Sequence, residues 1–212
     1  MNQTKGHFIT FEGIDGSGKS TQISLLREKI EQTGASCYET AEPSTGPIGS
    51  MLRQFLSGRI KANEDTLAAL FAADRLDHLK NKTDGICTKI EQGIHVICDR
   101  YVLSNYAYQG VRVPLEWVMQ LNHAANETLR PDCHIFIDID PELAMERMAK
   151  NRFHTDLFET KERLTEVRNC YLSLIEQLST TEQIIIINGN QSVEQIADEI
   201  WQKTSTLFTD IH

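Results

Sequence analysis

Eight residues near the N-terminus have the types and the spacing of a loop that binds phosphate groups. They read Gly13-Ile14-Asp15-Gly16-Ser17-Gly18-Lys19-Ser20 and fit the pattern G-x-x-x-x-G-K-S/T. Glycines allow the backbone to curl so that its N–H groups converge on phosphate oxygens, and the start of a following helix favours negative charge. Lys19 is expected to bridge the β- and γ-phosphates of a nucleoside triphosphate, and Ser20 to ligate Mg²⁺. The pattern predicts a nucleotide site from Gly13 to Thr21.

This loop alone does not distinguish GTPases, ATPase motors and kinases. The segment Asn81-Lys82-Thr83-Asp84 is misplaced for the Asn-Lys-x-Asp motif that reads guanine, because it falls inside a helical pattern. A motor ATPase would need partner domains and a longer chain. The length of 212 residues therefore favours a small kinase that acts alone and uses ATP.

A second group of polar residues begins with Asp99-Arg100-Tyr101, at the end of a predicted strand. In an open parallel sheet, residues at the carboxyl ends of the strands face the ligand crevice. Asp99 is therefore expected near the phosphate loop, where it orients Mg²⁺ through water, and Arg100 is expected to face the phosphates that react. The structural alternative is an ion pair between Asp99 and Arg100 that only holds a loop.

Two helical segments carry side chains that could bind a base. Residues four positions apart lie on neighbouring turns of one helix face. Such pairs combine hydroxyl and amide groups in one segment, and an aromatic ring with a planar guanidinium in the other. The pairs are Ser104/Tyr108, Asn105/Gln109 and Phe71/Arg75. For Phe71 alone, a position in the hydrophobic core is the alternative.

A basic segment lies between two predicted helices of this acidic protein. Its residues are Arg147, Lys150, Asn151, Arg152, Phe153 and His154. Phosphoryl transfer spreads negative charge over equatorial oxygens, so a basic lid over residues 147–160 could neutralise that charge and exclude water. The alternative is an ordinary helix end, where the helix dipole favours basic residues.

The elements that must position these residues follow an alternation of short apolar runs and helical patterns. Continuous apolar runs are typical of a parallel sheet that is covered on both faces. Helix starts are predicted at Asp140-Pro141 and at a capping box of Ser192 and Gln195. The alternation predicts one α/β domain over residues 1–212, with the three-layer P-loop NTPase fold and a five-stranded parallel sheet. The predicted strands are His7–Glu12, Ala35–Thr40, Ile94–Asp99, Cys133–Asp138 and Ile184–Asn188.

The composition limits the partners of the protein. A formal charge of −9 opposes general affinity for nucleic acid or for an anionic membrane, so a site for an anionic substrate must be locally basic. No apolar run is long enough to cross a bilayer, and the N-terminus lacks the pattern of a secretory signal. Five scattered cysteines indicate reduced thiols. We therefore expect a cytoplasmic protein.

Four segments resemble, in order, the motifs of thymidylate kinases: FEGIDGSGKSTQ, EPSTGPIGSMLRQFL, LFAADR and DRYVLSNYAYQG. The resemblance covers nearly the whole chain, and the last segment is the most specific. It implies a nucleoside monophosphate kinase that transfers a phosphoryl group from ATP and Mg²⁺ directly in line to dTMP, for dTTP synthesis. It also implies a homodimer. A kinase for another small acceptor and a nucleotide-dependent binding module are the other hypotheses.

The resemblance also implies roles for the matching residues of the acceptor site. Phe71 would stack on thymine, Arg75 would contact its O4, and Asn105 with Gln109 would bind the rest of the base edge. Tyr108 would crowd the position of a ribose 2′-hydroxyl and so favour deoxynucleotides. The remaining acceptor residues would be Asp15, Glu42, Pro43, Arg53, Arg100 and Ser104, with Arg53 and Arg100 on the phosphate.

Family members with glycine at the position of Gly16 usually supply a catalytic arginine from the lid. The resemblance therefore implies Arg152 for this role, with Arg147 as the second choice. The expected catalytic residues are Asp15, Lys19, Arg100 and Arg152, and the expected metal site consists of Ser20 and Asp99.

Overall fold

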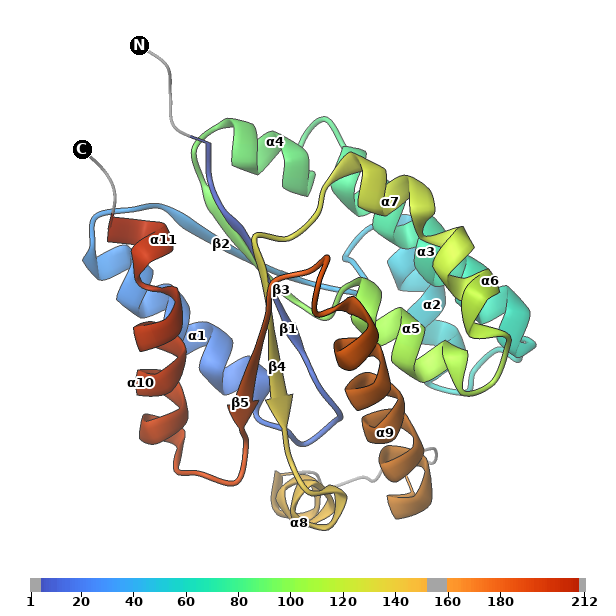
Figure 1. The fold of residues 1–212 in the computed structure, drawn as a ribbon. Helices are drawn as coiled ribbons and strands as arrows, with labels where there is room; N and C mark the ends of the chain where they lie inside the picture. The colour runs from blue at the N-terminus through green and yellow to red at the C-terminus, as the bar shows by residue number, and fades with distance from the viewer. Residues whose placement is uncertain (1–4, 152–159, 210–212) are drawn as a thin grey trace.

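The centre of the protein is a sheet of five parallel strands (Figure 1). The computed structural model describes residues 5–151 and 160–209. The strand order is β2-β3-β1-β4-β5, so β1, which leads into the phosphate loop, is central. The predicted fold is confirmed, and each predicted strand ends within about two residues of its expected position. The strands are β1 Phe8–Glu12, β2 Cys37–Ala41, β3 His95–Asp99, β4 Cys133–Asp138 and β5 Ile184–Asn188.

Helices cover both faces of this sheet (Figure 1). α1, α10 and α11 lie on one face, and most of the other helices lie on the opposite face, while α8 lies beyond the carboxyl end of β4. The helices are α1 Lys19–Gln32, α2 Pro47–Leu56, α3 Glu64–Lys80, α4 Ile86–Glu91, α5 Val102–Gly110, α6 Leu115–Leu121, α7 His123–Thr128, α8 Pro141–Asn151, α9 Lys161–Leu178, α10 Val193–Thr204 and α11 Thr206–Thr209.

Alternate residues of the strands enter two separate cores. In β1, Ile9 packs with residues of α1 and α10, such as Leu26 and Ile200. Its neighbour Phe8 packs on the other face, with residues of α3, α5 and α9 that include Leu103. Since side chains alternate along a strand, a sheet covered on both faces needs apolar residues at nearly every position. Both cores fix the carboxyl ends of the strands relative to one another.

The two predicted helix starts are confirmed. At α8, the Asp140 carboxylate accepts a hydrogen bond of 2.8 Å from the N–H of Glu142, and Pro141 is the first helical residue. At α10, the Ser192 hydroxyl accepts from the N–H of Gln195, whose side chain accepts from the N–H of Ser192. These caps satisfy backbone donors that have no partner within the helix.

The expectation that residues 81–84 lie inside a helix is wrong. α3 ends at Lys80, and the Asn81 side chain accepts from the N–H of Thr83 over 2.9 Å, a contact that favours a turn over a continued helix. α4 follows and leads into the amino end of β3, at the edge of the sheet opposite to the phosphate loop (Figure 1). The segment is therefore misplaced for reading guanine, but because of its location rather than its helical pattern.

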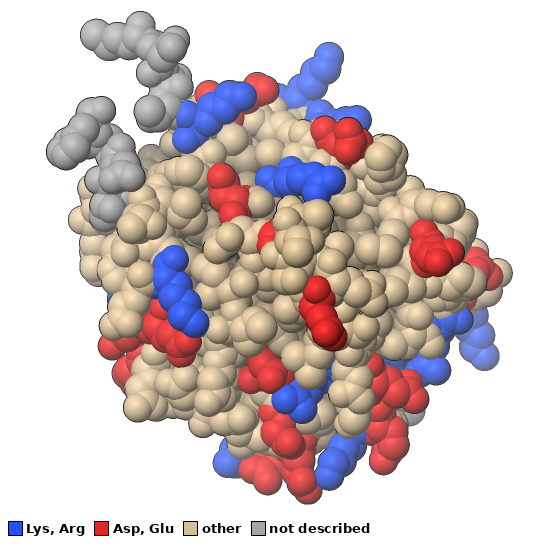
Figure 2. Space-filling view, viewed as in Figure 1, with Lys and Arg blue, Asp and Glu red and all other residues tan. Residues whose placement is uncertain are grey.

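None of the helices in the described part of the chain is long and apolar enough to cross a membrane. On the face drawn in Figure 2, Lys and Arg side chains are scattered among Asp and Glu, between wide areas of uncharged residues. The charges on this face are thus mixed in sign and are not gathered into one patch.

Candidate active site

Two cavities lie at the carboxyl edge of the sheet, and Asp15 and Arg100 line both of them. The larger has a volume of about 620 Å³ and follows the phosphate loop; we call it the donor cavity. The smaller has a volume of about 290 Å³ and lies between the residues that follow β2 and β3; we call it the acceptor cavity. Asp15 follows β1 and Arg100 follows β3, so the two cavities meet beside the centre of the sheet.

The phosphate loop forms one wall of the donor cavity. Residues 15 to 22 all line the cavity, and the loop ends at Gly18, which has a φ of 93° and caps the N-terminus of α1. The Lys19 ammonium donates to the carbonyl oxygens of Gly13 and Ile14, each over 3.2 Å. Burial, together with the charge of Arg100, lowers the pKa of Lys19. A buried cation beside a helix N-terminus provides the environment that stabilises phosphate groups.

Gly16 allows the phosphate loop to pack directly against α8. Its φ is 79°, and a Cβ atom built at this position would lie 2.5 Å from the carbonyl oxygen of Ala144 and 3.0 Å from the Met148 side chain. A side chain therefore does not fit here without a shift of the α8 backbone. The close approach brings α8 to the donor cavity, which Arg147 and Lys150 also line.

The pair of Ser20 and Asp99 suits a magnesium ion. The Ser20 hydroxyl donates to Asp99 Oδ2 over 3.4 Å, and Asp99 Oδ1 is buried without a hydrogen-bond partner among the described residues. Mg²⁺ prefers hard oxygen ligands and keeps several of its own waters. A hydroxyl at the start of α1 and an unsatisfied carboxylate oxygen beside it fit that requirement.

Arg100 is held in one orientation between the two cavities. Its φ is 72°, and its guanidinium forms an ion pair with Asp15 in which Nη2 lies 2.7 Å from Oδ1. The same group donates to the Gly13 carbonyl over 3.1 Å, to Ser104 over 3.3 Å and to the Tyr108 hydroxyl over 3.2 Å. Burial opposes the charge, but Asp15 and the neighbouring acidic groups hold the pKa of Arg100 well above its ordinary value. Arg100 thus presents a permanent, oriented cation.

Glu12 forms hydrogen bonds with several residues close to Arg100. Its carboxyl group is fully buried and accepts from the N–H of Tyr101 over 2.9 Å, from the Ser104 hydroxyl over 2.5 Å and from the Tyr171 hydroxyl over 3.3 Å. Burial raises the pKa of Glu12 to about 7, although the hydrogen bond from Ser104 and the charge of Arg100 oppose that rise. Glu12 therefore connects the end of β1 to the start of α5.

The acceptor cavity contains all the residues that the sequence predicted for it except Arg53. Phe71 is partly exposed and lines this cavity, so it is not simply a core residue. Four polar residues of α5 that the sequence predicted for this site also line the cavity, on the helix face predicted from their spacing. They are Ser104, Asn105, Tyr108 and Gln109. The lining residues are Asp15, Glu42, Pro43, Leu56, Phe71, Arg75, Arg100, Tyr101, Ser104, Asn105, Tyr108, Gln109 and Arg163.

Arg75 lies deep in the wall of the acceptor cavity, with an exposed fraction of 1%. Its Nη2 lies 2.6 Å from the Glu42 carboxylate, and its Nη1 donates to Asn105 over 3.3 Å and to Asn122. Burial opposes the charge of Arg75, but Glu42 and Tyr101 raise its pKa above the ordinary value. The Nε atom is buried without a hydrogen-bond partner among the described residues, which leaves one donor unused.

Arg53 contacts the loop after β2 rather than the cavity. Its guanidinium donates to the carbonyls of Pro43 and Ser44, over 3.0 Å and 2.5 Å, and to the Ser50 hydroxyl over 3.0 Å. Ser44 is also bound by the buried Asp74 carboxylate, through its N–H over 2.7 Å and its hydroxyl over 2.6 Å. In this structure Arg53 holds the loop that carries Glu42, a role that the sequence did not indicate.

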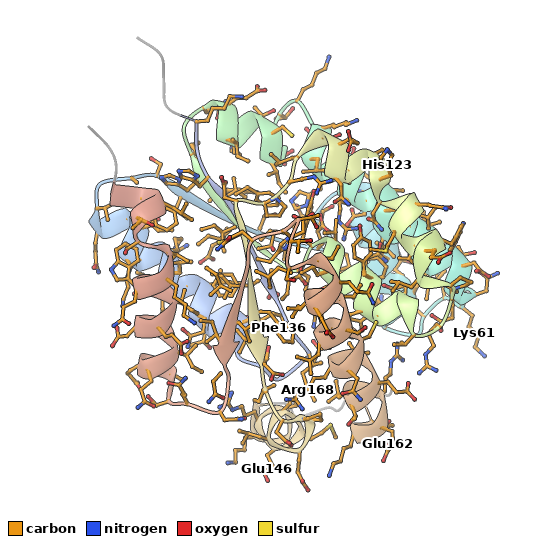
Figure 3. The ribbon with its side chains drawn as sticks, viewed as in Figure 1. Lys61, His123, Phe136, Glu146, Glu162 and Arg168 are labelled. Atoms are coloured by element: carbon orange, nitrogen blue, oxygen red, sulfur yellow. The ribbon has the colours of Figure 1, made fainter. Side chains whose placement is uncertain are left out.

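The basic segment is described only in part. Arg147 lines the donor cavity and donates to the carbonyl of Gly189 over 3.0 Å. Arg152, the arginine expected to be catalytic, lies with residues 153–159 outside the described residues. Beyond them, Arg168 of α9 points to the end of β4, where its Nε and Nη2 donate to Asp138 over 2.6 Å and 2.9 Å (Figure 3). This bidentate pair attaches the helix after the segment to the sheet.

Several lining residues were missed by the sequence analysis. On the donor side they are Gln22, Met148, Gln191, Ser192, Val193 and Ile196, and on the acceptor side they are Leu56, Tyr101 and Arg163. Gln191 and Ser192 follow the end of β5, so the rule that identified Asp99 would also have found them. Arg163 is one of several charged residues at the start of α9, and no sequence pattern distinguishes it.

A central parallel sheet, a phosphate loop and a second polar cavity that meets the first define a P-loop kinase with a separate acceptor site. Comparison with known families gives a match to the model described as "Thymidylate kinase" over residues 11–200. The chain belongs to the thymidylate kinase family and is a nucleoside monophosphate kinase.

Individual relatives agree with this family over nearly their full lengths. The "Probable thymidylate kinase" of Methanocaldococcus jannaschii is 38% identical, over 91% of this chain and 93% of the relative. The "Thymidylate kinase" of Ligilactobacillus salivarius is 35% identical, over 92% and 95%. The "Probable thymidylate kinase" of Pyrococcus abyssi is 36% identical, over 92% and 94%.

Proposed function

We propose that this enzyme transfers the γ-phosphoryl group of ATP to dTMP, with Mg²⁺, and releases ADP and dTDP. The observation that carries the proposal is that Asp15 and Arg100 line both the donor and the acceptor cavity. A triphosphate bound on the phosphate loop and a monophosphate beside Arg100 would therefore meet head to head. Their two reacting ends would lie at the boundary of the cavities.

The acceptor cavity suits a thymine base. The ring of Phe71 offers a stacking surface, and the unused Nε donor of Arg75 offers a hydrogen bond to a carbonyl oxygen. The Tyr108 hydroxyl donates to Asp15 Oδ2 over 2.9 Å, which fixes the ring where it would crowd a ribose 2′-hydroxyl. The relatives named above carry the name of thymidylate kinase, which favours dTMP over other monophosphates of similar size.

The chemistry is a direct in-line displacement. A phosphate oxygen of dTMP attacks the γ-phosphorus of ATP, the bond from that phosphorus to the bridging oxygen breaks, and ADP leaves, without a covalent enzyme intermediate. Lys19 would bind the β- and γ-phosphates, and Arg100 would hold the acceptor phosphate and neutralise charge as the groups approach. Ser20 directly, and Asp99 through water, would hold Mg²⁺, which would supply positive charge to offset that of the phosphates.

Two further arginines belong to this proposal. Arg147 lines the donor cavity and could reach the transferred group, and Arg152 remains the expected catalytic arginine of the basic segment. Arg53 would join the acceptor phosphate by exchanging a carbonyl contact for a phosphate oxygen. The homodimer implied by the family resemblance also remains a prediction, which light scattering coupled to size-exclusion chromatography would test.

The substrate is tested by ADP release in a coupled assay with dTMP, dUMP, CMP, AMP and deoxythymidine as acceptors. We expect the highest kcat/KM with dTMP and no turnover when EDTA removes Mg²⁺. Deoxythymidine should be a poor acceptor, because it lacks the phosphate group that Arg100 would hold beside the donor cavity. Equal rates with all the monophosphates, or a preference for deoxythymidine, would refute the proposal.

A further inference from the structure

Arg100 has a backbone conformation that few residues other than glycine adopt. Its φ is 72°, and among the residues that the structure describes no other residue except glycine has a positive φ. For an arginine this conformation costs free energy, so it persists only where the surrounding structure holds it. The groups that hold it bear on the reaction, because Arg100 lines both the donor and the acceptor cavity.

Strand β1 holds the backbone on both sides of Arg100. The N–H of Arg100 donates to the carbonyl of Phe11, and the N–H of Tyr101 donates to Glu12 Oε1, each over 2.9 Å. The first contact uses a backbone carbonyl, which any residue at position 11 would provide. The second requires a side chain with an acceptor, so Glu12 is the side chain of β1 that fixes the peptide between Arg100 and the start of α5.

Glu12 also orients the hydroxyl group beside the guanidinium. Ser104 donates to Glu12 Oε2 over 2.5 Å, and a hydroxyl has one hydrogen to donate. Its oxygen is therefore left as an acceptor, 3.3 Å from Arg100 Nη1, which can only donate. The Tyr171 hydroxyl, 2.7 Å from Ser104 and 3.3 Å from Glu12, completes the cluster as a donor. Glu12 thus reaches Arg100 through the backbone at Tyr101 and through the side chain of Ser104.

A carboxylate can accept both of these hydrogen bonds, whereas a carboxamide cannot. Glu12 uses one oxygen for the Tyr101 N–H and the other for Ser104. A glutamine has a single oxygen, which the Tyr101 N–H would occupy because that group can only donate. The NH₂ group would then face Ser104, whose hydroxyl would have to turn its hydrogen elsewhere. Glu12 is itself fully buried and lines neither cavity, so it does not touch a substrate bound there.

We propose that Glu12 is a positioning residue for phosphoryl transfer, which acts on the acceptor phosphate only through Arg100. It fixes the peptide that follows Arg100 and the hydroxyl beside its guanidinium. The cation is thereby held at the boundary of the two cavities, where the reacting phosphates would meet, before any substrate binds. This inference rests on the proposed function, in which Arg100 holds the phosphate group of the acceptor.

A double-mutant cycle of Glu12→Gln with Arg100→Ala tests this role. Glu12→Gln alone should lower kcat/KM for dTMP at least about tenfold, because a small misplacement of a catalytic group is costly. The KM for dTMP should rise more than the KM for ATP. When Arg100 is already replaced by alanine, Glu12→Gln should change kcat/KM by less than about twofold. A merely structural role would lower kcat/KM by the same factor in both backgrounds.

Two further variants complete the design. Glu182→Gln is the matched control, because this partly buried carboxyl pairs with Arg130 over 2.6 Å and lines neither cavity; its kinetics should equal those of the wild type. Glu12→Asp serves if circular dichroism shows that Glu12→Gln does not fold. It keeps the charge, but it is one methylene shorter and cannot bind both Tyr101 and Ser104, so the same cycle applies.

The inference is overturned if the folded Glu12 variant keeps kcat/KM within about twofold of the wild type, or loses as much with Arg100→Ala as without it. If the wild type accepts another monophosphate in place of dTMP, only the proposed acceptor has failed. The cycle is then run with that monophosphate, because Arg100 would hold its phosphate in the same way. If no monophosphate is phosphorylated, both the proposed function and the role of Glu12 are refuted.

Discussion

The guanidinium of Arg100 and the carboxylate of Asp15 form an ion pair of 2.7 Å at the boundary between the donor and acceptor cavities. Both side chains are partly buried, so neither charge is fully solvated. A phosphate group that enters beside Arg100 offers the guanidinium a second anionic partner. Binding therefore does not require the removal of a fully hydrated arginine from water, a step that costs several kcal/mol per ion.

Arg100→Ala should lower kcat by at least about a hundredfold, because removal of an oriented cation withdraws stabilisation from the reacting phosphates. Steady-state kinetics with dTMP and ATP measure this loss, and circular dichroism reports whether the fold persists. Arg112→Ala is the matched control, since Arg112 lies 3.8 Å from Glu166 and lines neither cavity. Similar losses in both variants would contradict the role of Arg100.

Lys19→Ala should lose nearly all turnover while the protein stays folded. Among the residues that the structure describes, the ammonium donates hydrogen bonds only to the carbonyls of Gly13 and Ile14, and its proposed partners are phosphate oxygens. ADP release measures the loss. Lys29→Ala on the same helix removes a contact with Asp198 and should retain activity. If circular dichroism showed that Lys19→Ala unfolds, Lys19 would be a structural residue and the prediction would be wrong.

Phe71→Ala should raise the KM for dTMP about tenfold, because stacking of an aromatic ring on a base contributes on the order of 1–3 kcal/mol. The KM for ATP should change little, since Phe71 does not line the donor cavity. Phe71→Tyr retains the ring and should keep most of the affinity. An equal rise in both KM values would indicate a general disturbance of the fold.

Glu12 should make stability fall as the pH rises. Its pKa is raised from 4.5 to about 7, so between these values the folded state binds more protons than the unfolded state. The free energy of unfolding should therefore decline from pH 4.5 to pH 7 and then level off as far as this group is concerned. Urea denaturation of the wild type and of Glu12→Gln at several pH values measures the difference. A decline that is equally steep in Glu12→Gln would assign it to other groups.

Local sequence patterns were sufficient for the fold and for much of the site. The apolar run Cys133–Asp138 coincides with β4, and the phosphate loop begins directly after β1, as expected. The face of α5 was predicted from its spacing of four residues, because that spacing is a property of the helix itself. Such patterns depend on neighbours along the chain, which the sequence lists in order.

The missed features depend on contacts between distant segments. Asn122 is an isolated polar residue between two short helices, and only the packing of α6 and α7 against α3 brings it to Arg75. The contacts of Arg53 with the carbonyls of Pro43 and Ser44 were also not predicted, because they depend on how α2 folds back on the loop after β2. The turn at residues 81–84 was assigned to a helix, because its charged residues are equally compatible with a solvated helix end.

The absence of a side chain at Gly16 has a consequence for protein engineering. With the carbonyl of Ala144 in its path, any larger residue at this position requires the phosphate loop and α8 to move apart, which would change the place of Arg147 relative to the loop. Exchange of the loop alone with a homologue that carries arginine there should therefore yield a poorly folded or inactive chimaera. A successful graft would have to transplant the loop and α8 together, so these two segments form one exchangeable module.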